Sequence, residues 1–174
     1  MKNLIMGIIG FFLLACISSA NATTKPLAKP YQYVSHTNIQ FHIKQNEGYS
    51  KRVYLDTEGH KTVGYGHKLP KKSRYQVGDF VNDERIRRWF QADYQTAINC
   101  GRRFLKNDYN EKELTVVTDM AFNLGCNALY EFNRFRKAIN NHDYKTSAKE
   151  IRLSKYYKQV KNRAERNINI LERI

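Results

Sequence analysis

The chain contains 174 residues, of which 41% are hydrophobic, and this is enough for one compact domain or for two small lobes that share a cleft. Its formal net charge of +14 predicts an anionic partner, and nucleic acid, anionic lipid or a cell-wall polymer with carboxylates and phosphates would each satisfy it. The sequence contains no P-loop, dinucleotide fingerprint, Cys-x-x-Cys pair, His-Glu-x-x-His motif or acidic calcium loop, so we expect neither a metal nor another cofactor.

Residues 1–22 are typical of an export signal. Lys2 is their only charged residue, and Leu4 to Ala15 form a twelve-residue apolar run that is short for a membrane span. Cleavage after the closing Ala-Asn-Ala triplet would start the mature chain at Thr23 and lower the formal charge from +14 to +13 by removing Lys2. We therefore expect export to the periplasm or the cell exterior. Two alternatives remain open: a lipoprotein with a lipidated Cys16, and retention of the segment as a releasable membrane anchor.

Residues 23–36 contain two of the three prolines and show no hydrophobic period. This composition predicts a linker or an extended N-terminal arm. The folded domain is then expected over residues 37–174.

A helix is predicted from Asn38 to Gly48. Asn38 is suited to the N-cap, Ile39 and Ile43 mark one face, and Gly48 is a good C-terminal stop. Glu47 would lie in the last turn, where the negative end of the helix dipole disfavours its ionised form and raises its pKa. A proton donor in hydrolysis needs this bias.

A β-hairpin is predicted next, with strands at residues 53–55 and 61–65 and a tight turn at residues 56–59. Asp56 ends the first strand and Thr62 belongs to the second, so both side chains can face a cleft whose other wall carries Glu47. Two carboxylates in different environments across a cleft are the groups that glycoside hydrolysis requires.

The stretch from Glu47 to His67 resembles the motif of the phage-type lysozymes, glycoside hydrolase family 24. That motif has a Glu-Gly at a helix end, an Asp nine positions after the Glu, a Thr six positions later, and a Gly-x-Gly-His close. The resemblance covers about residues 38–166. It implies an α+β, mainly α, lysozyme-like fold, in which a long helix joins a small N-terminal lobe with a short β-sheet to a helical C-terminal lobe, with the cleft between them.

The resemblance also implies an N-acetylmuramidase that cleaves the β-1,4 bond between N-acetylmuramic acid and N-acetylglucosamine in peptidoglycan and so lyses the bacterial wall. Glu47 would be the general acid, and Asp56 with Thr62 would position and activate a water on the opposite face of the sugar. That arrangement leads to inversion, whereas a closer pair of carboxyls would lead to a retaining route. A purely electrostatic role for Asp56 remains an alternative.

Asn82 is a plausible N-cap for a long helix that ends near Leu105, with apolar residues at helical spacing. The resemblance places this helix between the two lobes. It also pairs Asp93 on the helix with His67, and such a pair would orient the hairpin and take no part in the chemistry.

A capping box at residues 110–113 predicts a further helix that ends at the signature Phe122-Asn123-Leu124-Gly125. The resemblance makes Asn123 a candidate saccharide contact, and a C-terminal helix cap is the alternative. Short helices are predicted at residues 132–141 and 143–153. In the segment that follows, the resemblance implies that Arg163 pairs with Glu47. Because a guanidinium lowers a carboxyl pKa while burial raises it, the sequence leaves the balance at Glu47 open.

Cys100 and Cys126 form an even pair in a chain expected to be exported, so a disulfide between them is permitted. Similar placement of cysteines in some members of the resembled family favours the bond. Two free buried thiols are the alternative.

The implied partners are peptidoglycan and anionic cell-wall polymers, with a lysozyme inhibitor or an immunity protein as a further candidate. We expect a monomer and no nucleic acid. Two other functions remain: a lytic transglycosylase, and a non-catalytic basic module that binds the wall or nucleic acid. Glu47, Asp56 and Thr62 argue against both, because a binder needs no such set and the Asp and Thr favour water as the nucleophile.

Overall fold

The computed structural model describes residues 35–106 and 108–174, so the predicted export signal 1–22 and nearly all of the predicted linker 23–36 lie outside the described residues. The elements of the described part are, in chain order, α1 (His36–Glu47), β1 (Ser50–Leu55), β2 (Lys61–Gly64), β3 (His67–Lys68), α2 (Asp83–Phe104), α3 (Glu111–Leu124), α4 (Cys126–Tyr130), α5 (Asn133–Asn140), α6 (Tyr144–Arg152), α7 (Lys155–Gln159) and α8 (Lys161–Leu171).

The predicted hairpin is the core of a three-stranded antiparallel sheet in the order β1-β2-β3. Tyr54 lies opposite Thr62, and Leu55 lies opposite Lys61. The third strand, at His67 and Lys68, was not predicted, because two residues are too few to show an alternating pattern. The sheet places the end of β1 and the middle of β2 next to each other.

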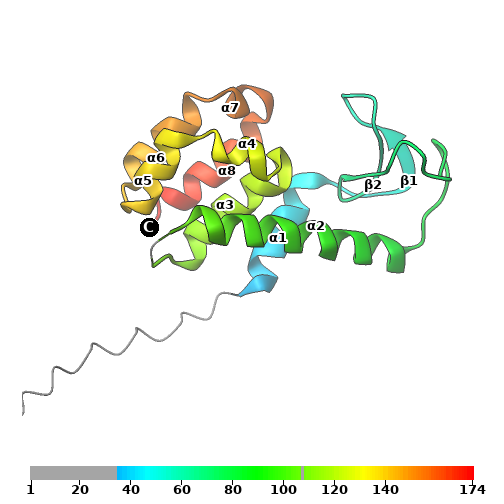
Figure 1. The fold of residues 1–174 in the computed structure, drawn as a ribbon, viewed down its shortest axis with the longest axis horizontal. Helices are drawn as coiled ribbons and strands as arrows, with labels where there is room; N and C mark the ends of the chain where they lie inside the picture. Colours follow the sequence, from blue (N-terminus) through cyan, green and yellow to red (C-terminus); the bar gives the residue numbers. More distant parts are fainter. Residues whose placement is uncertain (1–34, 107) are drawn as a thin grey trace, which may run out of the picture. The chain divides into compact units, whose positions relative to one another are not determined.

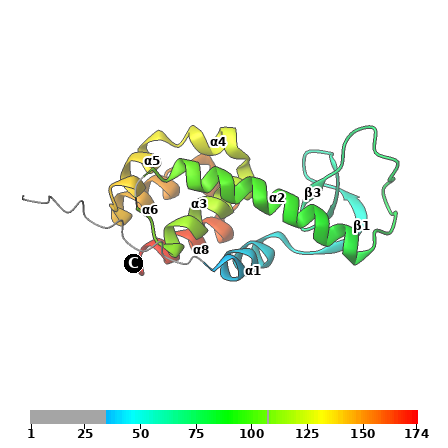
Figure 2. The ribbon, with the colours of Figure 1, turned by 60° about the horizontal axis from the view of Figure 1, so that its bottom comes forward.

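Helix α2 joins two separate hydrophobic cores, and these define the two lobes (Figure 1). Its Ile86 packs into the small core beneath the sheet, whereas Phe90 and Tyr94 belong to the large core of the helical lobe. Figure 2 shows the sheet at one end of α2 and α3 to α8 grouped at the other. The predicted α+β lysozyme-like fold, with a small sheet lobe and a helical lobe on one long helix, is confirmed.

Side-chain caps fix the ends of the two longest helices where the sequence predicts them. Asn82 accepts a hydrogen bond from the N–H of Arg85 at 2.9 Å at the start of α2. At the start of α3, the Asn110 side chain accepts from the Glu113 N–H at 3.0 Å, and Glu113 accepts from the Asn110 N–H at 2.7 Å. This capping box satisfies two N–H groups that have no partner within the helix.

Helix α1 begins at His36, two residues before the predicted N-cap, so the prediction for Asn38 is wrong. Ser35 is the N-cap, and its carbonyl oxygen accepts from the N–H groups of Asn38 and Ile39. The Asn38 side chain instead donates to Glu111 on α3 at 2.9 Å. A polar side chain that packs against another helix can thus imitate a cap in the sequence.

Helix α3 is the central helix of the helical lobe and packs against α1, α2, α4 and α8. Every residue from Glu113 to Ala121 is buried, including Asp119. Helices α5 and α6 lie where two short helices are predicted, but α4 was missed because five residues give no periodicity. None of the helices in the described part of the chain has both the length and the apolar character that crossing a bilayer requires.

Candidate active site

Glu47 is the last residue of α1, and its side chain is 15% exposed. Gly48 ends the helix with a φ of 69°, which favours glycine. Nη1 of Arg163 on α8 lies 2.5 Å from Oε1 of Glu47, so the predicted pairing is present. The structure therefore brings an acid from the first helix to a cation from the last.

The pKa of Glu47 is raised above its ordinary value, chiefly because burial penalises the charged form. The charge and hydrogen bond of Arg163 lower this pKa, and Asp119 raises it again, but burial outweighs the guanidinium. The sequence leaves the balance between Arg163 and burial open, and in the structure burial decides it in favour of a raised pKa. A carboxyl that keeps its proton to higher pH is suited to act as an acid.

The glycine-rich close of the motif lies against the second oxygen of the same carboxyl group. Gly66 has a φ of 83°, and a Cβ at this position would lie 3.1 Å from Oε2 of Glu47. A residue with a side chain would be strained at this φ, and its Cβ would lie closer to Oε2 than in an ordinary contact. Of the two oxygens of Glu47, Arg163 therefore binds Oε1, and a glycine leaves space beside Oε2.

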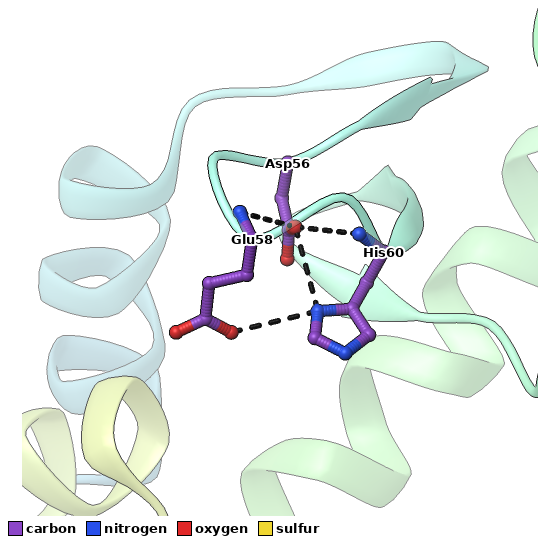
Figure 3. A group of neighbouring side chains, drawn as sticks. All are labelled: Asp56, Glu58 and His60. Atoms are coloured by element: carbon purple, nitrogen blue, oxygen red, sulfur yellow. Dashed lines mark hydrogen bonds and ion pairs between the residues drawn. The ribbon is translucent and has the colours of Figure 1, made fainter.

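Asp56 holds the turn of the hairpin together. Its Oδ1 accepts from the N–H of Glu58 at 2.9 Å and from the N–H of His60 at 2.8 Å (Figure 3). These backbone hydrogen bonds, with that of His60 the strongest cause, hold the pKa of Asp56 below its ordinary value, and Lys68 and His60 lower it further. Asp56 is thus built to stay ionised, in contrast to Glu47.

Asp56, Glu58 and His60 offer oxygen and nitrogen atoms that lie within 4.8 Å of one another, an arrangement that could hold a metal (Figure 3). However, the Lys68 ammonium lies 2.7 Å from Glu58 and 3.5 Å from Asp56. A divalent cation would have to displace this positive charge, and Oδ1 of Asp56 is already engaged with two N–H groups. The cluster is better described as a charged turn than as a metal centre.

Thr62 lies on β2 beside the turn and is only 2% exposed. Its hydroxyl donates to the carbonyl oxygen of His60 at 3.1 Å. The oxygen keeps lone pairs that can accept from a water, but its own hydrogen is committed to the turn. The structure shows this structural bond, and the role of Thr62 with water stays a prediction.

Tyr54 connects the two acids electrostatically. Burial raises the pKa of its hydroxyl, and the negative charges of Glu47 and Asp56 raise it further. Both carboxylates therefore act on one phenol, although one comes from α1 and the other from the end of β1. At 37% exposure the Tyr54 ring is also accessible from solvent beside both acids.

His67 and Asp93 form the predicted pair, with Nδ1 lying 2.7 Å from Oδ2. The imidazole also stacks on Trp89 with ring centroids 4.7 Å apart and planes 10° apart. Trp89 was not predicted, although it lies four residues before Asp93 on the same helix face. These contacts fix the third strand to α2.

The main part of the site that sequence reasoning missed is Asp119. This carboxylate is fully buried on α3 and binds Arg163 through Nε at 2.9 Å and Nη2 at 2.8 Å. Amide groups of Asn46 and Asn167 donate to its two oxygens at 2.9 Å and 2.7 Å. One signal was available, because Asp119 is the one charged residue between Leu114 and Leu124 of a predicted helix, and a buried acid there needs a paired cation.

Asn123, the predicted saccharide contact, is exposed in the last turn of α3. It does not cap the helix, because the N–H of Gly125 makes the capping bond to the Ala121 carbonyl oxygen. Contact of Asn123 with a saccharide stays a prediction. The disulfide between Cys100 and Cys126 is present and ties α2 to the start of α4.

A pocket of about 470 Å³ lies away from these acids, between α1, α3 and α8. Several of its polar groups have partners in the protein: Lys112 donates to the carbonyl oxygen of Arg173, and Glu111 accepts from Asn38. Another lining residue, Arg166, donates to Asn46. Neither of the two acids with oppositely shifted pKa values lines this pocket, so the functional site is assigned to Glu47 and Asp56.

A small sheet lobe and a helical lobe on one long helix, with an acid of raised pKa at a helix end and an acid of lowered pKa at a hairpin turn, define a lysozyme-like protein. The model of the phage lysozyme family matches residues 44–170, and the chain belongs to this family.

Among similar proteins, the peptidoglycan hydrolase gp36 of Pseudomonas phage phiKMV is 28% identical over 130 residues, which cover 74% of this chain but only 14% of gp36. Probable T4-type lysozyme 1 of Dictyostelium discoideum is 22% identical over 161 residues, with 78% of this chain and 94% of that protein covered. The pre-baseplate central spike protein Gp5 of Enterobacteria phage T4 is 25% identical over 173 residues, with 86% of this chain and 30% of Gp5 covered. The chain thus spans a small part of the two phage proteins and nearly all of the third.

Proposed function

We propose that the chain is a peptidoglycan hydrolase, and specifically an N-acetylmuramidase that cleaves the β-1,4 bond between N-acetylmuramic acid and N-acetylglucosamine. The observation that carries this proposal is the contrast between the two acids: the pKa of Glu47 is raised, the pKa of Asp56 is lowered, and both act on Tyr54. Glycoside hydrolysis uses two carboxyl groups whose pKa values differ in this way, one as the proton donor and one in its ionised form. A relative named as a peptidoglycan hydrolase and another named as a probable lysozyme support the choice of substrate.

In the proposed reaction, Glu47 donates its proton to the glycosidic oxygen, and the bond between that oxygen and C1 of N-acetylmuramic acid breaks. Positive charge develops at C1 and the ring oxygen. A water attacks C1 and releases one proton to solvent, so that the products are a reducing-end N-acetylmuramic acid and a free 4-hydroxyl on N-acetylglucosamine. Glu47 then recovers a proton from solvent.

We assign to Asp56 the task of stabilising the positive charge and holding the water. Its lowered pKa makes it a weak proton acceptor that keeps its negative charge to lower pH than an ordinary aspartate. Two backbone N–H groups bind Oδ1, whereas Oδ2 has the Lys68 ammonium 3.5 Å away, so Oδ2 is the oxygen that would face the sugar or the water. Thr62 would assist through the lone pairs of its hydroxyl oxygen.

The excess of cations supports a polyanionic wall as the surface on which the enzyme acts. The chain has 30 Lys and Arg residues against 16 Asp and Glu residues. This attraction is screened by salt, so binding to purified wall should weaken as salt rises, whereas cleavage still requires Glu47. Substrate recognition by charge and catalysis by the two acids are therefore separable.

The experiment is mass spectrometry of the soluble products released from purified peptidoglycan by wild type, Glu47→Gln and Asp56→Asn. We expect wild type to release fragments with reducing-end muramic acid and Glu47→Gln to lose about 10²-fold or more of the rate while still folding. Anhydro-muramic ends would identify a lytic transglycosylase instead. Binding without any released fragment from wild type would identify a non-catalytic wall-binding protein.

We also propose that the protein is exported, with cleavage before Thr23. The disulfide between Cys100 and Cys126 supports this, because such bonds persist in oxidising compartments. The mass of the protein recovered from the periplasm or medium tests it: a mature chain that starts at Thr23 is expected. A lipidated Cys16 or an uncleaved chain held at the membrane would refute it.

A further inference from the structure

Asp119 is a fully buried acid whose side chain touches no solvent. It forms a bidentate salt bridge with the Arg163 guanidinium, in which Nε donates to Oδ2 at 2.9 Å and Nη2 donates to Oδ1 at 2.8 Å. Nη2 also donates to the Asp119 backbone oxygen at 3.2 Å. This bidentate geometry fixes both the position and the plane of the guanidinium. The hydroxyl of a saccharide cannot reach Asp119, so the residue acts through another group.

Arg163 is itself buried, at 5% exposed, and it divides its hydrogen bonds between two carboxylates. Nε and Nη2 point to Asp119, and only Nη1 is left for Glu47. Since Oε1 of Glu47 takes that single bond, Oε2 remains for the substrate beside Gly66. The negative charge of Asp119 therefore offsets most of the positive charge of Arg163 beside Glu47.

We propose that Asp119 is a positioning residue of the active site, which fixes Arg163 and offsets its charge so that Glu47 keeps the proton it must donate. This inference rests on the proposed function, because it assumes that Glu47 works in its protonated form. It adds a residue that the motif from Glu47 to His67 does not contain, and it gives the guanidinium a defined task. Arg163 orients the Glu47 carboxyl group, and Asp119 offsets the charge of Arg163 that would otherwise favour the ionised form of Glu47.

Two asparagine side chains donate hydrogen bonds to the Asp119 carboxylate in addition to those from Arg163. Asn46 donates to Oδ1 at 2.9 Å, and Asn167 donates to Oδ2 at 2.7 Å. Asn167 is oriented in turn by the Tyr156 hydroxyl at 3.1 Å and by Nε2 of His42 at 3.0 Å. Hydrogen-bond donors thus approach both oxygens of Asp119, as a buried carboxylate requires.

The charged and titratable groups that face Glu47 come from four elements: Arg163 from α8, Asp119 from α3, Tyr54 from β1 and Tyr156 from α7. Arg163 is the cation among them. If a substitution removes the charge of Asp119, Glu47 is the one carboxylate of the described residues that still pairs with the guanidinium, which then stabilises the ionised form of Glu47. An ionised Glu47 cannot protonate the leaving group, so the damage would be greatest at neutral and alkaline pH.

The direct test is a carboxyl-carbon NMR titration of the full chain labelled at its glutamates, with the Glu47 signal assigned by its absence in Glu47→Gln. In wild type we expect Glu47 to titrate above the exposed glutamates. In Asp119→Asn the midpoint should fall by about one pH unit or more. Asp143→Asn is the matched control, since it removes the same charge from a surface helix cap that asparagine also serves, and it should not move the midpoint.

Activity gives an independent readout. If the inference holds, the alkaline limb of the kcat/KM profile on peptidoglycan moves to lower pH in Asp119→Asn by the same amount as the NMR midpoint. A folded Asp119→Asn whose Glu47 midpoint is unchanged would overturn the inference, even if its activity fell. A purely structural role for Asp119 would lower the rate at every pH without moving the limb.

Asp119→Asn leaves Arg163 with one carboxylate fewer in a buried site, and the variant could fail to fold. The double variant Asp119→Asn with Arg163→Gln then decides, because it removes both buried charges together and leaves neither unpaired. If Asp119 offsets the charge of Arg163, the Glu47 midpoint of this double variant should stay near the wild-type value. A clear rise of the midpoint would show that Arg163 was not offset and would refute the inference. Because the NMR titration needs no substrate, it stays readable if wild type releases no fragments. The absence of released fragments would refute the proposed hydrolase activity, whereas the NMR midpoints would still test the effect of Asp119 on Glu47.

Discussion

Gly66 lies so close to Glu47 that a Cβ added to it would come within 3.1 Å of Oε2. The glycine thereby keeps open the one side of the carboxyl group that Arg163 does not bind. The close approach connects the last part of the sequence motif to its first residue. It explains physically why the loop after β2 needs a glycine at this position.

Gly66→Ala should therefore reduce activity by roughly 10-fold to 100-fold, because a displaced general acid no longer meets the leaving oxygen. Gly78→Ala is the matched control, since Gly78 also has a positive φ, of 94°, but a Cβ there meets nothing within 4 Å. Both variants should lose about 1 kcal/mol of stability through backbone strain. Equal activities in the two variants would show that the contact with Glu47 has no consequence.

The raised pKa of Glu47 also predicts how stability depends on pH. Because the folded state binds this proton more tightly than the unfolded state, the stability that Glu47 contributes is complete below its ordinary value of 4.5 and is lost as pH rises through the folded-state pKa. Glu47→Gln should not show this pH-dependent loss of unfolding free energy, because glutamine does not titrate. The difference in unfolding free energy between wild type and Glu47→Gln should shift in favour of the variant from pH 4.5 toward neutrality, as denaturant titrations can measure. A constant difference would contradict the prediction.

The pair between His67 and Asp93 should matter for the stability of the sheet lobe more than for chemistry. Asp93→Ala should cost about 1 kcal/mol by removing the partner of a ring that stacks on Trp89, and it should keep activity within a few-fold of wild type. Glu84→Ala, which removes an exposed acid from an i,i+4 pair with Arg88 on the same helix, should cost about 0.5 kcal/mol or less. A loss of activity as large as that of Glu47→Gln would instead place His67 in the reaction.

The disulfide joins cysteines 26 residues apart, and loop-closure entropy then gives a stabilisation of roughly 3.5 kcal/mol. The Cys100→Ala and Cys126→Ala double variant should lose about that much unfolding free energy, with a lower thermal midpoint. Wild type treated with a reductant should show the same loss, and the double variant should not respond to the reductant. A reductant-insensitive wild type would contradict the stabilising role of the bond.

The sequence predicts best where a local signal and a long periodic pattern agree. Asn82 and the apolar spacing after it predict α2 from end to end, and the capping box of Asn110 and Glu113 predicts the start of α3. Partners distant in the chain, such as Arg163 for Glu47, came only from resemblance to a family. Periodicity cannot show which side chains meet when they are more than one helix apart.

Other features could not be predicted because their cause is tertiary. The charge of Asp119 in a predicted buried helix points to a paired acid, but only the packing of α3 against α8 identifies Arg163 as its partner. Burial likewise decides the pKa of Glu47, and no local pattern gives its extent. The start of α1 was misplaced because Asn38 binds Glu111 on another helix.

The bond between Glu47 and Arg163 joins residues 116 positions apart, and this affects when the enzyme can become active. A ribosome completes α1 long before it adds the helices that bury its last residue. Until then Glu47 ends a twelve-residue helix that is marginal by itself, and a solvated glutamate is ionised at neutral pH. A partly made or still unfolded chain therefore has no proton donor, and the cell that synthesises the protein meets its proposed lytic activity only after the C-terminal helix has packed.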